Sequence, residues 1–377
     1  MRVGLIVHDN KWTGAGAVAE LHCRALHAVG IEARLLFVGG RNLERRLGES
    51  QWAEPILLKE RSPAQFRSNL RTVAALAREC DLVICHLPHD QLLCVTAGVH
   101  RCVPLVRSFR NPRHIRRDPY HRFLDRRLTA ALCANSALGS GVRRSAPDLP
   151  TAVLPAPLEE RFEPADGSVW RDRLGIPSGV PVVGAAGKLA KARGFGFLLE
   201  AASHLTVPAH VVIVGHGELL PQLQGKAEQL RLEGRVHWTG YQDEALPELY
   251  SAMDVVLFTA PGSDWGHRSI SEAQGCGRPV VAISCQGVHD LIEDGVNGWI
   301  VDRDPAALSN AVDTLLGDSE LAHRMGRAAA AAAVYRRMVP VGHRLARFLE
   351  ATLSQDQGHV PDARPTISSA GSRPGRP

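Results

Sequence analysis

The chain of 377 residues carries a formal net charge of +5 and is 45% hydrophobic but only 5% aromatic. This length exceeds the size at which a single hydrophobic core stops growing, so we expect two domains with ample apolar material for their cores. Aliphatic residues, Ala and Gly dominate the composition, which is common in α/β layers. No window approaches eighteen uninterrupted apolar residues, so the sequence excludes a membrane-spanning helix.

The eight cysteines form no CxxC pair and have no histidine partner at metal-ligand spacing. We interpret them as small buried thiols in a reducing compartment, in place of a disulfide framework or a zinc site. No metal and no cofactor are expected. The amino terminus has one charge before a strand-like run that is too short for the core of a signal peptide, so a cytoplasmic protein is predicted.

Positive charge gathers between Arg101 and Arg127, where nine arginines stand against two aspartates. Such a run is typical of a solvated face, but it also fits an anionic acceptor or peripheral docking on the inner face of a membrane. Nucleic acid is the weakest alternative, because no binding motif or aromatic interleaving accompanies the arginines. We therefore expect no nucleic-acid partner.

Short aliphatic runs alternate with longer segments of helical period, which is typical of parallel strands joined by crossover helices. In the first half, the predicted strands are Arg2–His8, Ala33–Val38, Leu82–His86, Val103–Arg107, Ala131–Ala134 and Ala152–Leu154. Helices are predicted there near Gly16–Val29, Ser62–Glu79 and Pro119–Thr129. In the second half, the predicted strands are Val180–Ala186, Ala209–Val214, Val236–Thr239, Val255–Phe258, Pro279–Ile283 and Trp299–Val301.

A segment dense in Pro and charge, from Pro155 to Pro181, separates the two alternations and is interpreted as a linker. Each half therefore predicts a doubly wound sheet that binds ligands outside the carboxyl ends of its strands. The Ala-rich segment Pro305–Leu353 is predicted to be helical throughout. The expected organisation is an amino-terminal domain 1–160, a carboxyl-terminal domain 161–334, a helix 335–353 returning to the first domain, and a disordered tail 354–377.

The run Gly14-Ala15-Gly16-Ala17-Val18-Ala19 matches the letters of a dinucleotide fingerprint. Its context differs, because the preceding strand ends five residues earlier and the next strand has no acid to hold a ribose. NAD binding is therefore disfavoured. The glycines still allow a backbone to approach a ligand before a helix amino terminus that favours anions, and a purely structural turn is the alternative.

Two further turns follow strands of the second half. After "VVGAAG", Lys188 and Arg193 lie on a loop, where two cations suit a diphosphate as charge grows on a leaving phosphate; solvated loop cations are the alternative. The turn Gly215–Glu218 repeats this geometry after the next strand.

The stretch "PGSDWGHRSISEAQGCGRPVVA" places Asp264 on a loop and Glu272 on a helix. Apolar neighbours predict that Glu272 is partly buried and needs hydrogen-bond donors, for which ribose hydroxyls are suitable. An ordinary i,i+4 ion pair between Arg268 and Glu272 is the competing interpretation.

Taken in order, these elements resemble the retaining nucleotide-sugar glycosyltransferases of the GT-B fold, family 4 or group 1 type, which is typified by bacterial cell-envelope and lipopolysaccharide enzymes. "DWGHRSISEAQGCGRPVVA" resembles the family pattern E-G-F-G-x-x-x-x-E-A-x-A-x-G-x-P-V-V-A. "CQGVHDLIEDGVNGWIV" and "GKLAKARG" resemble two more family segments. The resemblance implies an α/β protein with two doubly wound, parallel-sheet Rossmann-like domains that face a central cleft.

The resemblance also implies roles for individual residues. Lys188, Arg193 and Asp264 would act catalytically on the donor diphosphate and sugar. The donor would be held by Gly14, Gly16, Gly187, Gly215, Glu218, Tyr241, Gly266, His267, Arg268 and Glu272. Glu272 would hold the ribose hydroxyls, and the departing phosphate would deprotonate the acceptor, so that no strong protein base is needed. Fixed cations and helix N–H groups would stabilise the leaving phosphate without a metal.

This sequence departs from the family pattern at several positions. Asp264 is one methylene shorter than the expected Glu, and Lys188 and Arg193 exchange the expected Arg and Lys. Where many relatives carry a His after a strand of the first domain, this chain has Arg110. The acceptor-side candidates are Arg110, Arg113 and His114, with His86 and His89 as rivals for a catalytic histidine.

The expected function is transfer of a sugar, with retention, from a nucleoside-diphosphate sugar to a glycan, lipid-linked or other anionic acceptor in cell-envelope polysaccharide or lipopolysaccharide synthesis. Two alternatives remain open. One is a nucleotide-sugar epimerase on the same scaffold, and the other is an inactive homologue that only binds the nucleotide sugar.

Overall fold

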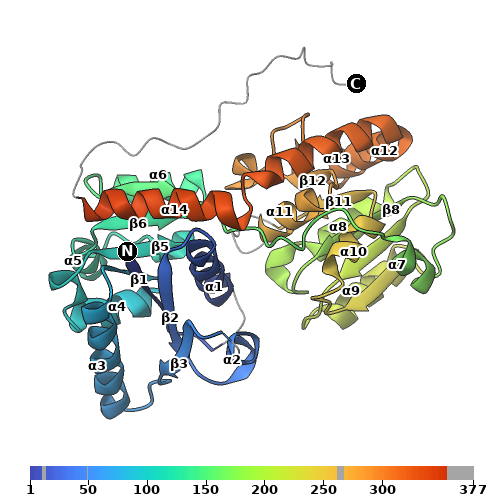
Figure 1. The fold of residues 1–377 in the computed structure, drawn as a ribbon. Helices are drawn as coiled ribbons and strands as arrows, with labels where there is room; N and C mark the ends of the chain where they lie inside the picture. Colours follow the sequence, from blue (N-terminus) through green and yellow to red (C-terminus); the bar gives the residue numbers. More distant parts are fainter. Residues whose placement is uncertain (11–13, 49, 261–266, 355–377) are drawn as a thin grey trace. The chain divides into compact units, whose positions relative to one another are not determined.

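The computed structural model describes residues 1–10, 14–48, 50–260 and 267–354. The chain forms two compact units, which we describe separately (Figure 1). Unit 1 combines Met1–Pro157 with the segment that begins at Arg337, and unit 2 comprises Leu158–Arg336. No helix of the described residues is long and apolar enough to cross a membrane.

Unit 1 is built on a seven-stranded parallel sheet with strand order β3-β2-β1-β4-β5-β6-β7. Its strands are β1 Arg2–Val7, β2 Glu32–Val38, β3 Ala53–Leu57, β4 Leu82–Cys85, β5 Leu105–Phe109, β6 Ala130–Cys133 and β7 Thr151–Val153. Its α-helices are α1 Gly14–His27, α2 Arg41–Leu47, α3 Pro63–Glu79, α4 Pro88–Thr96, α5 Pro119–Asp125, α6 Ser136–Ser145 and α14 Met338–Leu353.

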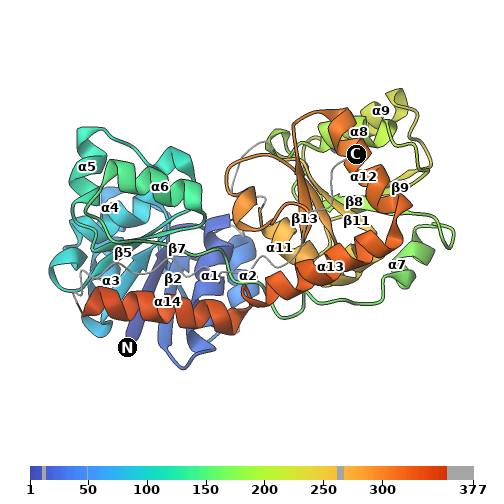
Figure 2. The ribbon, with the colours of Figure 1, turned by 90° about the horizontal axis from the view of Figure 1, so that it is seen from above.

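Both faces of this sheet are covered, so its inner strands are continuous apolar runs. Successive residues of β1 enter opposite cores: Leu5 belongs to the core shared with α1 and α14, and Ile6 belongs to the core beneath α3. The helices α1 and α14 pack closely, because a Cβ added at Gly342 would lie 2.2 Å from the carbonyl oxygen of Ala25 (Figure 2). The carboxyl-terminal helix is thereby part of unit 1.

Unit 2 has a six-stranded parallel sheet with strand order β10-β9-β8-β11-β12-β13. Its strands are β8 Val182–Ala186, β9 His210–Val214, β10 Val236–Gly240, β11 Val255–Phe258, β12 Val280–Ile283 and β13 Gly298–Val301. Its α-helices are α7 Ser168–Arg173, α8 Phe195–Ser203, α9 Leu220–Gln229, α10 Leu246–Ala252, α11 His267–Gly275, α12 Pro305–Gly317 and α13 Ser319–Val334. The two predicted doubly wound parallel sheets are confirmed.

Three features of the chain differ from the sequence-based predictions. Strand β3 was not predicted, because it is an edge strand whose middle residues are exposed and so lacks an apolar run. The presumed linker is partly core, since Leu158 and Phe162 are buried in unit 2. The segment Pro305–Leu353 is three helices, because Asp318 caps the amino end of α13 and the chain turns again before α14.

The cysteines of the described residues are all free thiols. Six of them are buried, as predicted, whereas Cys102 is exposed and Cys285 is half-buried. The predicted disordered tail lies, after Ser354, outside the described residues.

Candidate functional site

The turns after β8 and β9 of unit 2 touch each other through their backbones. Gly187 N–H donates to the Val214 carbonyl at 2.9 Å, and Gly215 N–H donates to Gly240 at 2.8 Å. Gly215 has a φ of 144°, and a Cβ there would lie 1.9 Å from the carbonyl oxygen of Gly187. Only glycine therefore allows the two turns to come this close at the carboxyl edge of the sheet.

The two predicted cations lie on the loop that follows β8. Lys188 is exposed and Arg193 is half-buried. The loop is anchored at its end, because the Thr259 hydroxyl donates to the carbonyl of Gly194 at 3.1 Å, just beyond strand β11. Gly194 begins α8 in the left-handed conformation and supplies no side-chain cap, so the helix amino terminus faces this loop uncapped.

Glu272 is a buried carboxylate on α11, with 7% of its surface exposed. The Tyr250 hydroxyl donates to its Oε2 at 3.1 Å, and Arg268 Nη2 lies 3.0 Å from its Oε1. The i,i+4 ion pair that the sequence offered as an alternative is thus present, with Glu272 buried and Arg268 half-buried. Burial beside this carboxylate raises the pKa of Tyr250 well above its usual value, so its hydroxyl stays a donor.

Other predicted donor residues are more scattered. Glu218 is exposed after β9, and Tyr241 is 67% exposed after β10. His267 is buried at the start of α11, where its ring stacks on Phe258 at 5.5 Å between centroids. Asp264 and Gly266 lie outside the described residues. Binding of a donor by any of these residues stays a prediction.

The segment "GVNGWIV" has a clear structural role in unit 2. The Asn297 side chain accepts from Glu293 N–H at 2.9 Å and closes the turn before β13. A Cβ at Gly298 would lie 2.5 Å from the Val280 carbonyl oxygen, so glycine allows β13 to pair with β12. This family-like motif therefore builds the sheet edge.

The carboxyl edge of the unit 1 sheet gathers histidines from several segments. Gly14 and Gly16 lie in the first turn of α1, which begins two residues earlier than predicted, so both glycines are within the helix and not in a turn before it. His86 follows β4 and is buried against His22 of α1, with 3.4 Å between His86 Nε2 and His22 Nδ1. His22 Nε2 has no hydrogen-bond partner among the described residues.

Both imidazoles are held in the neutral form. Burial lowers the pKa of His86 to about 4 and lowers that of His22 well below its usual value, and the nearby charge of Arg110 lowers both further. Of the two rivals for a catalytic histidine, His86 is therefore a buried neutral group that bonds to the Ile6 carbonyl at 3.1 Å through Nδ1. The sequence signal for this site was only the strand end before His86, because His22 lies within α1.

The arginine run does not form one solvated face. Arg107 is 1% exposed within β5, where its Nη1 bonds to Gln91 and lies 3.6 Å from Asp125. Its Nε and Nη2 atoms have no hydrogen-bond partner within the described part of the chain. Counting Arg107 among surface charges was wrong, because β5 is an inner strand whose residues are all buried.

The acceptor-side candidates lie just beyond β5. Arg110 and His114 are half-buried, whereas Arg113 is exposed on the 3₁₀ turn Pro112–His114. Burial, with the charges of Arg107 and Arg116, lowers the pKa of His114 to about 4. The three residues are close in sequence and share one loop, but a role toward an acceptor stays a prediction.

A third histidine group, which the sequence reading did not find, joins His8, Glu60 and His89. His8 Nε2 lies 3.7 Å from Glu60 Oε1, and His89 Nε2 lies 3.1 Å from Glu60 Oε2. His8 follows β1, Glu60 follows β3, and His89 lies at the start of α4. Only the fold brings these three residues together.

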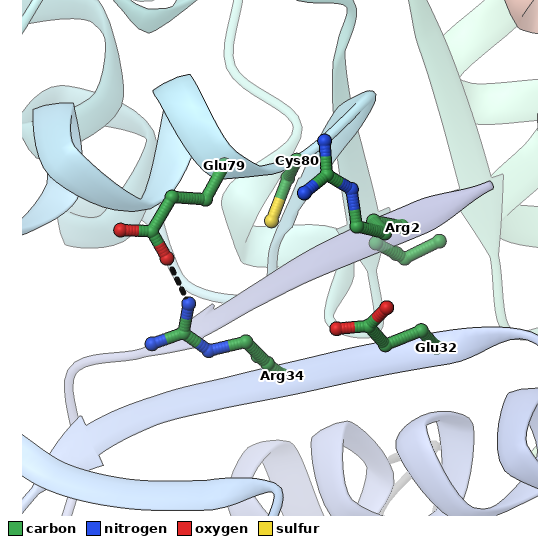
Figure 3. A pocket seen from close by; sticks show the side chains of 6 residues that line it. Arg2, Glu32, Arg34, Glu79 and Cys80 are labelled. Atoms are coloured by element: carbon green, nitrogen blue, oxygen red, sulfur yellow. Dashed lines mark hydrogen bonds and ion pairs between the residues drawn. The ribbon is translucent and has the colours of Figure 1, made fainter.

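A shallow pocket of about 240 Å³ lies at the opposite, amino-terminal edge of the unit 1 sheet (Figure 3). Arg34 pairs there with Glu79 and donates to Glu54 at 2.7 Å, so its charges are compensated internally. Burial raises the pKa of the Cys80 thiol to about 11, which leaves no activated nucleophile. This pocket has the features of a structural ion-pair network.

Comparison with known proteins identifies the family of unit 2. Residues 167–332 match the family model of glycosyl transferases group 1. Over 197 residues, the chain is 31% identical to D-inositol 3-phosphate glycosyltransferase from Xylanimonas cellulosilytica. This match covers 49% of this chain and 45% of that protein. Over 159 residues, it is 31% identical to the lipopolysaccharide core biosynthesis glycosyltransferase LpsE from Rhizobium meliloti. This match covers 42% of this chain and 46% of LpsE. The matches thus span less than half the length of these curated relatives.

A solved structure extends the likeness to both units. HepE from Anabaena, in complex with UDP, has a TM-score of 0.81 and 21% identity, over 93% of this chain and 100% of that one. At this identity the likeness shows the fold alone. Residues 167–332 thus match the group 1 glycosyl transferase family, and the chain has the GT-B fold.

Proposed function

We propose that the protein transfers a sugar from a nucleoside-diphosphate sugar to an acceptor. The observation that carries this proposal is the carboxyl edge of the unit 2 sheet, where glycine turns, loop cations and the buried Glu272 follow adjacent strands. The names of the relatives support it, as does a HepE complex that contains UDP-glucose. Glu272 would hold the ribose hydroxyls while Arg268 and Tyr250 keep its carboxylate oriented.

In this proposal, fixed charges stabilise the leaving diphosphate. Lys188 and Arg193, with the uncapped amino end of α8, would offset the charge that grows as the glycosidic bond breaks. We further propose that no divalent ion is required at the diphosphate. The departing phosphate oxygen would take the acceptor proton, which gives retention, and Asp264 would face the donor sugar.

Unit 1 would bind the acceptor. Arg110, Arg113 and His114 form a basic loop beyond β5, which favours an anionic glycan or a lipid-linked precursor. A place in cell-envelope polysaccharide or lipopolysaccharide synthesis would follow, and LpsE, by its name, acts in lipopolysaccharide core synthesis.

We also propose that unit 1 docks on the inner, anionic face of the membrane from the cytoplasm. On α5 the side chains of Tyr120 and Phe123 are 51% and 52% exposed, and exposed arginines Arg116 and Arg117 precede them. Aromatic rings with adjacent cations suit the interface of an anionic bilayer.

A thermal-shift screen across UDP-, GDP-, ADP- and TDP-sugars tests donor binding, because a ligand that binds only the folded state raises its stability. We expect one nucleotide class to raise the melting temperature. If none does at millimolar concentration, the donor proposal is wrong.

Release of nucleoside diphosphate then separates the functions. A transferase releases it in proportion to acceptor, an epimerase interconverts two donor sugars without acceptor, and an inactive homologue binds donor without release. Adding Mg²⁺ or Mn²⁺ to chelator-treated protein should leave the transfer rate unchanged; restoration from zero would contradict the role of Lys188 and Arg193.

A further inference from the structure

Three metal-ligating side chains meet at the carboxyl edge of the unit 1 sheet. The ligand atoms of His8, Glu60 and His89 all lie within 4.8 Å of one another, and the two imidazole-to-carboxylate distances are 3.7 and 3.1 Å. Two ligand atoms on a tetrahedral zinc ion, with bonds of about 2.0–2.1 Å, are roughly 3.3 Å apart. The 3.1 Å distance from His89 to Glu60 Oε2 is near this spacing, and the 3.7 Å distance from His8 runs to the other carboxylate oxygen, Oε1.

One atom of this group makes no hydrogen bond to the described residues. His89 Nε2 is shielded from solvent, yet it makes no hydrogen bond to any described residue, although Glu60 Oε2 is 3.1 Å away. The approach to the carboxylate is therefore misaligned for a hydrogen bond. Because a buried polar nitrogen without a partner costs free energy, this atom points to a missing ligand.

The backbone around two of the ligands is fixed by a buried carboxylate. Asp90, the third residue of α4, accepts from His8 N–H at 2.8 Å and from Leu87 N–H at 2.7 Å. It thereby ties the end of β1 to the start of α4, which carries His89. Such an outer layer of hydrogen bonds is what holds metal ligands in position.

The third ligand is positioned by a buried amide. Asn69 of α3 accepts from Leu58 N–H at 2.8 Å, and its Nδ2 donates to both the Leu58 carbonyl and Glu60 Oε1 at 2.8 Å. Asn69 is fully buried, so the loop after β3 is held against α3. Glu60 therefore has one oxygen oriented by Asn69, and its other oxygen lies beside His89.

We propose that His8, His89 and Glu60 bind one Zn²⁺ ion through His8 Nε2, His89 Nε2 and one carboxylate oxygen. Two imidazoles with a carboxylate suit zinc and disfavour Mg²⁺ or Ca²⁺, which prefer oxygen ligands. The fourth position is open to water or another oxygen ligand. His8 would exchange its 3.0 Å contact with the Leu58 carbonyl for the ion.

Equilibrium dialysis of the full chain with ZnCl₂, after removal of bound metal by a chelator, tests the site. We expect one tightly bound zinc per chain, and we expect Glu60→Gln and His89→Gln each to weaken its affinity at least about 100-fold. His210→Asn is the matched control: it breaks a second imidazole pair, 2.7 Å apart in unit 2, for which the described residues offer no third ligand.

Co²⁺ bound in place of zinc gives a second measurement. Its visible absorption should report a four-coordinate ion in the wild type and in His210→Asn, and this signal should be lost in His89→Gln. Unfolding curves recorded in chelator show whether each variant is folded. No tight zinc binding, or tight binding that survives both Glu60→Gln and His89→Gln, would overturn the proposal and leave an internal ion-pair network at this place.

Discussion

The carboxyl edges of the two sheets carry different chemistry although both sheets have the same winding. In unit 2, glycine turns let two loop backbones come into contact, Lys188 and Arg193 supply fixed charge, and one buried acid lies on α11. In unit 1, the corresponding edge is lined by imidazoles, the buried Asp90 and arginines. The unit 2 edge suits a phosphate group, whereas the unit 1 edge holds side chains that titrate or bind a metal.

The two edges therefore depend on different parts of the chain. The unit 2 edge depends on the backbone, so it tolerates few changes at its glycines. The unit 1 edge depends on side chains that several strand ends bring together, so its chemistry changes with single residues while the sheet remains.

The largest effect is expected for Gly215→Ala. A Cβ there would lie 1.9 Å from a backbone oxygen at a φ that favours glycine, so unit 2 should lose about 4 kcal/mol of stability. Urea unfolding measures this loss. The control Gly225→Ala lies in α9, where a Cβ meets nothing within 4 Å, and should add roughly 1 kcal/mol. If both variants changed stability equally, the close approach of the two backbones at Gly215 would not be the cause of the loss.

The unit 1 edge should respond to pH. His86 has a pKa of about 4 in the folded state, so between the unfolded value of about 6.5 and pH 4 the unfolded chain binds more protons. Its contribution to stability is complete above pH 6.5 and falls by up to about 3 kcal/mol as the pH falls to 4. The contribution of Asp90 to stability changes with pH in the opposite direction, because burial raises its pKa to about 7. The effect of His86 must therefore be measured in isolation, with a variant that removes its imidazole.

His86→Asn provides this isolation. Between pH 6.5 and 4, the unfolding free energy of the variant should fall less steeply with decreasing pH than that of the wild type. The difference in slope should correspond to at most about one proton bound on unfolding. His323→Asn, at an exposed position of α13 in unit 2, is the control. Parallel slopes for wild type and His86→Asn would mean that His86 has the same pKa in the folded and unfolded states.

A smaller effect is expected at the donor site. Glu272→Gln keeps the shape but loses the charge that Arg268 and Tyr250 orient, so donor affinity should fall about tenfold to thirtyfold while acceptor affinity stays constant. Isothermal titration with the nucleotide sugar measures the first quantity. Glu228→Gln on the exposed face of α9 is the control. An equal loss for donor and acceptor would place Glu272 outside the donor site.

The sequence was informative where chemistry follows from local pattern. The strand Val255–Phe258 was predicted with the observed bounds, because a buried parallel strand is a continuous apolar run. The burial of Glu272 followed from the apolar spacing around it. The glycine turns after β8 and β9 were also located, since each lies directly after such a strand.

The sequence was uninformative where neighbours in space are distant in the chain. His8, Glu60 and His89 have no common motif, and Glu60 follows the edge strand β3 that the pattern did not reveal. Arg107 was counted with the surface charges because a linear charge run carries no strand register. Helices α2, α4 and α6 are short, so their period is difficult to separate from that of loops.

The smallest effect is expected for one charge of the arginine run. Arg117 is exposed beside α5, so Arg117→Gln should weaken binding to vesicles with anionic lipid by about fivefold at low salt, and less at high salt. Arg144→Gln, at another exposed arginine of unit 1, is the matched control and should bind as the wild type does. Vesicle co-sedimentation gives the measurement, and the acceptor KM should be recorded beside it. A raised KM with unchanged vesicle binding would assign this charge to the acceptor, whereas no change in either would return it to solvent.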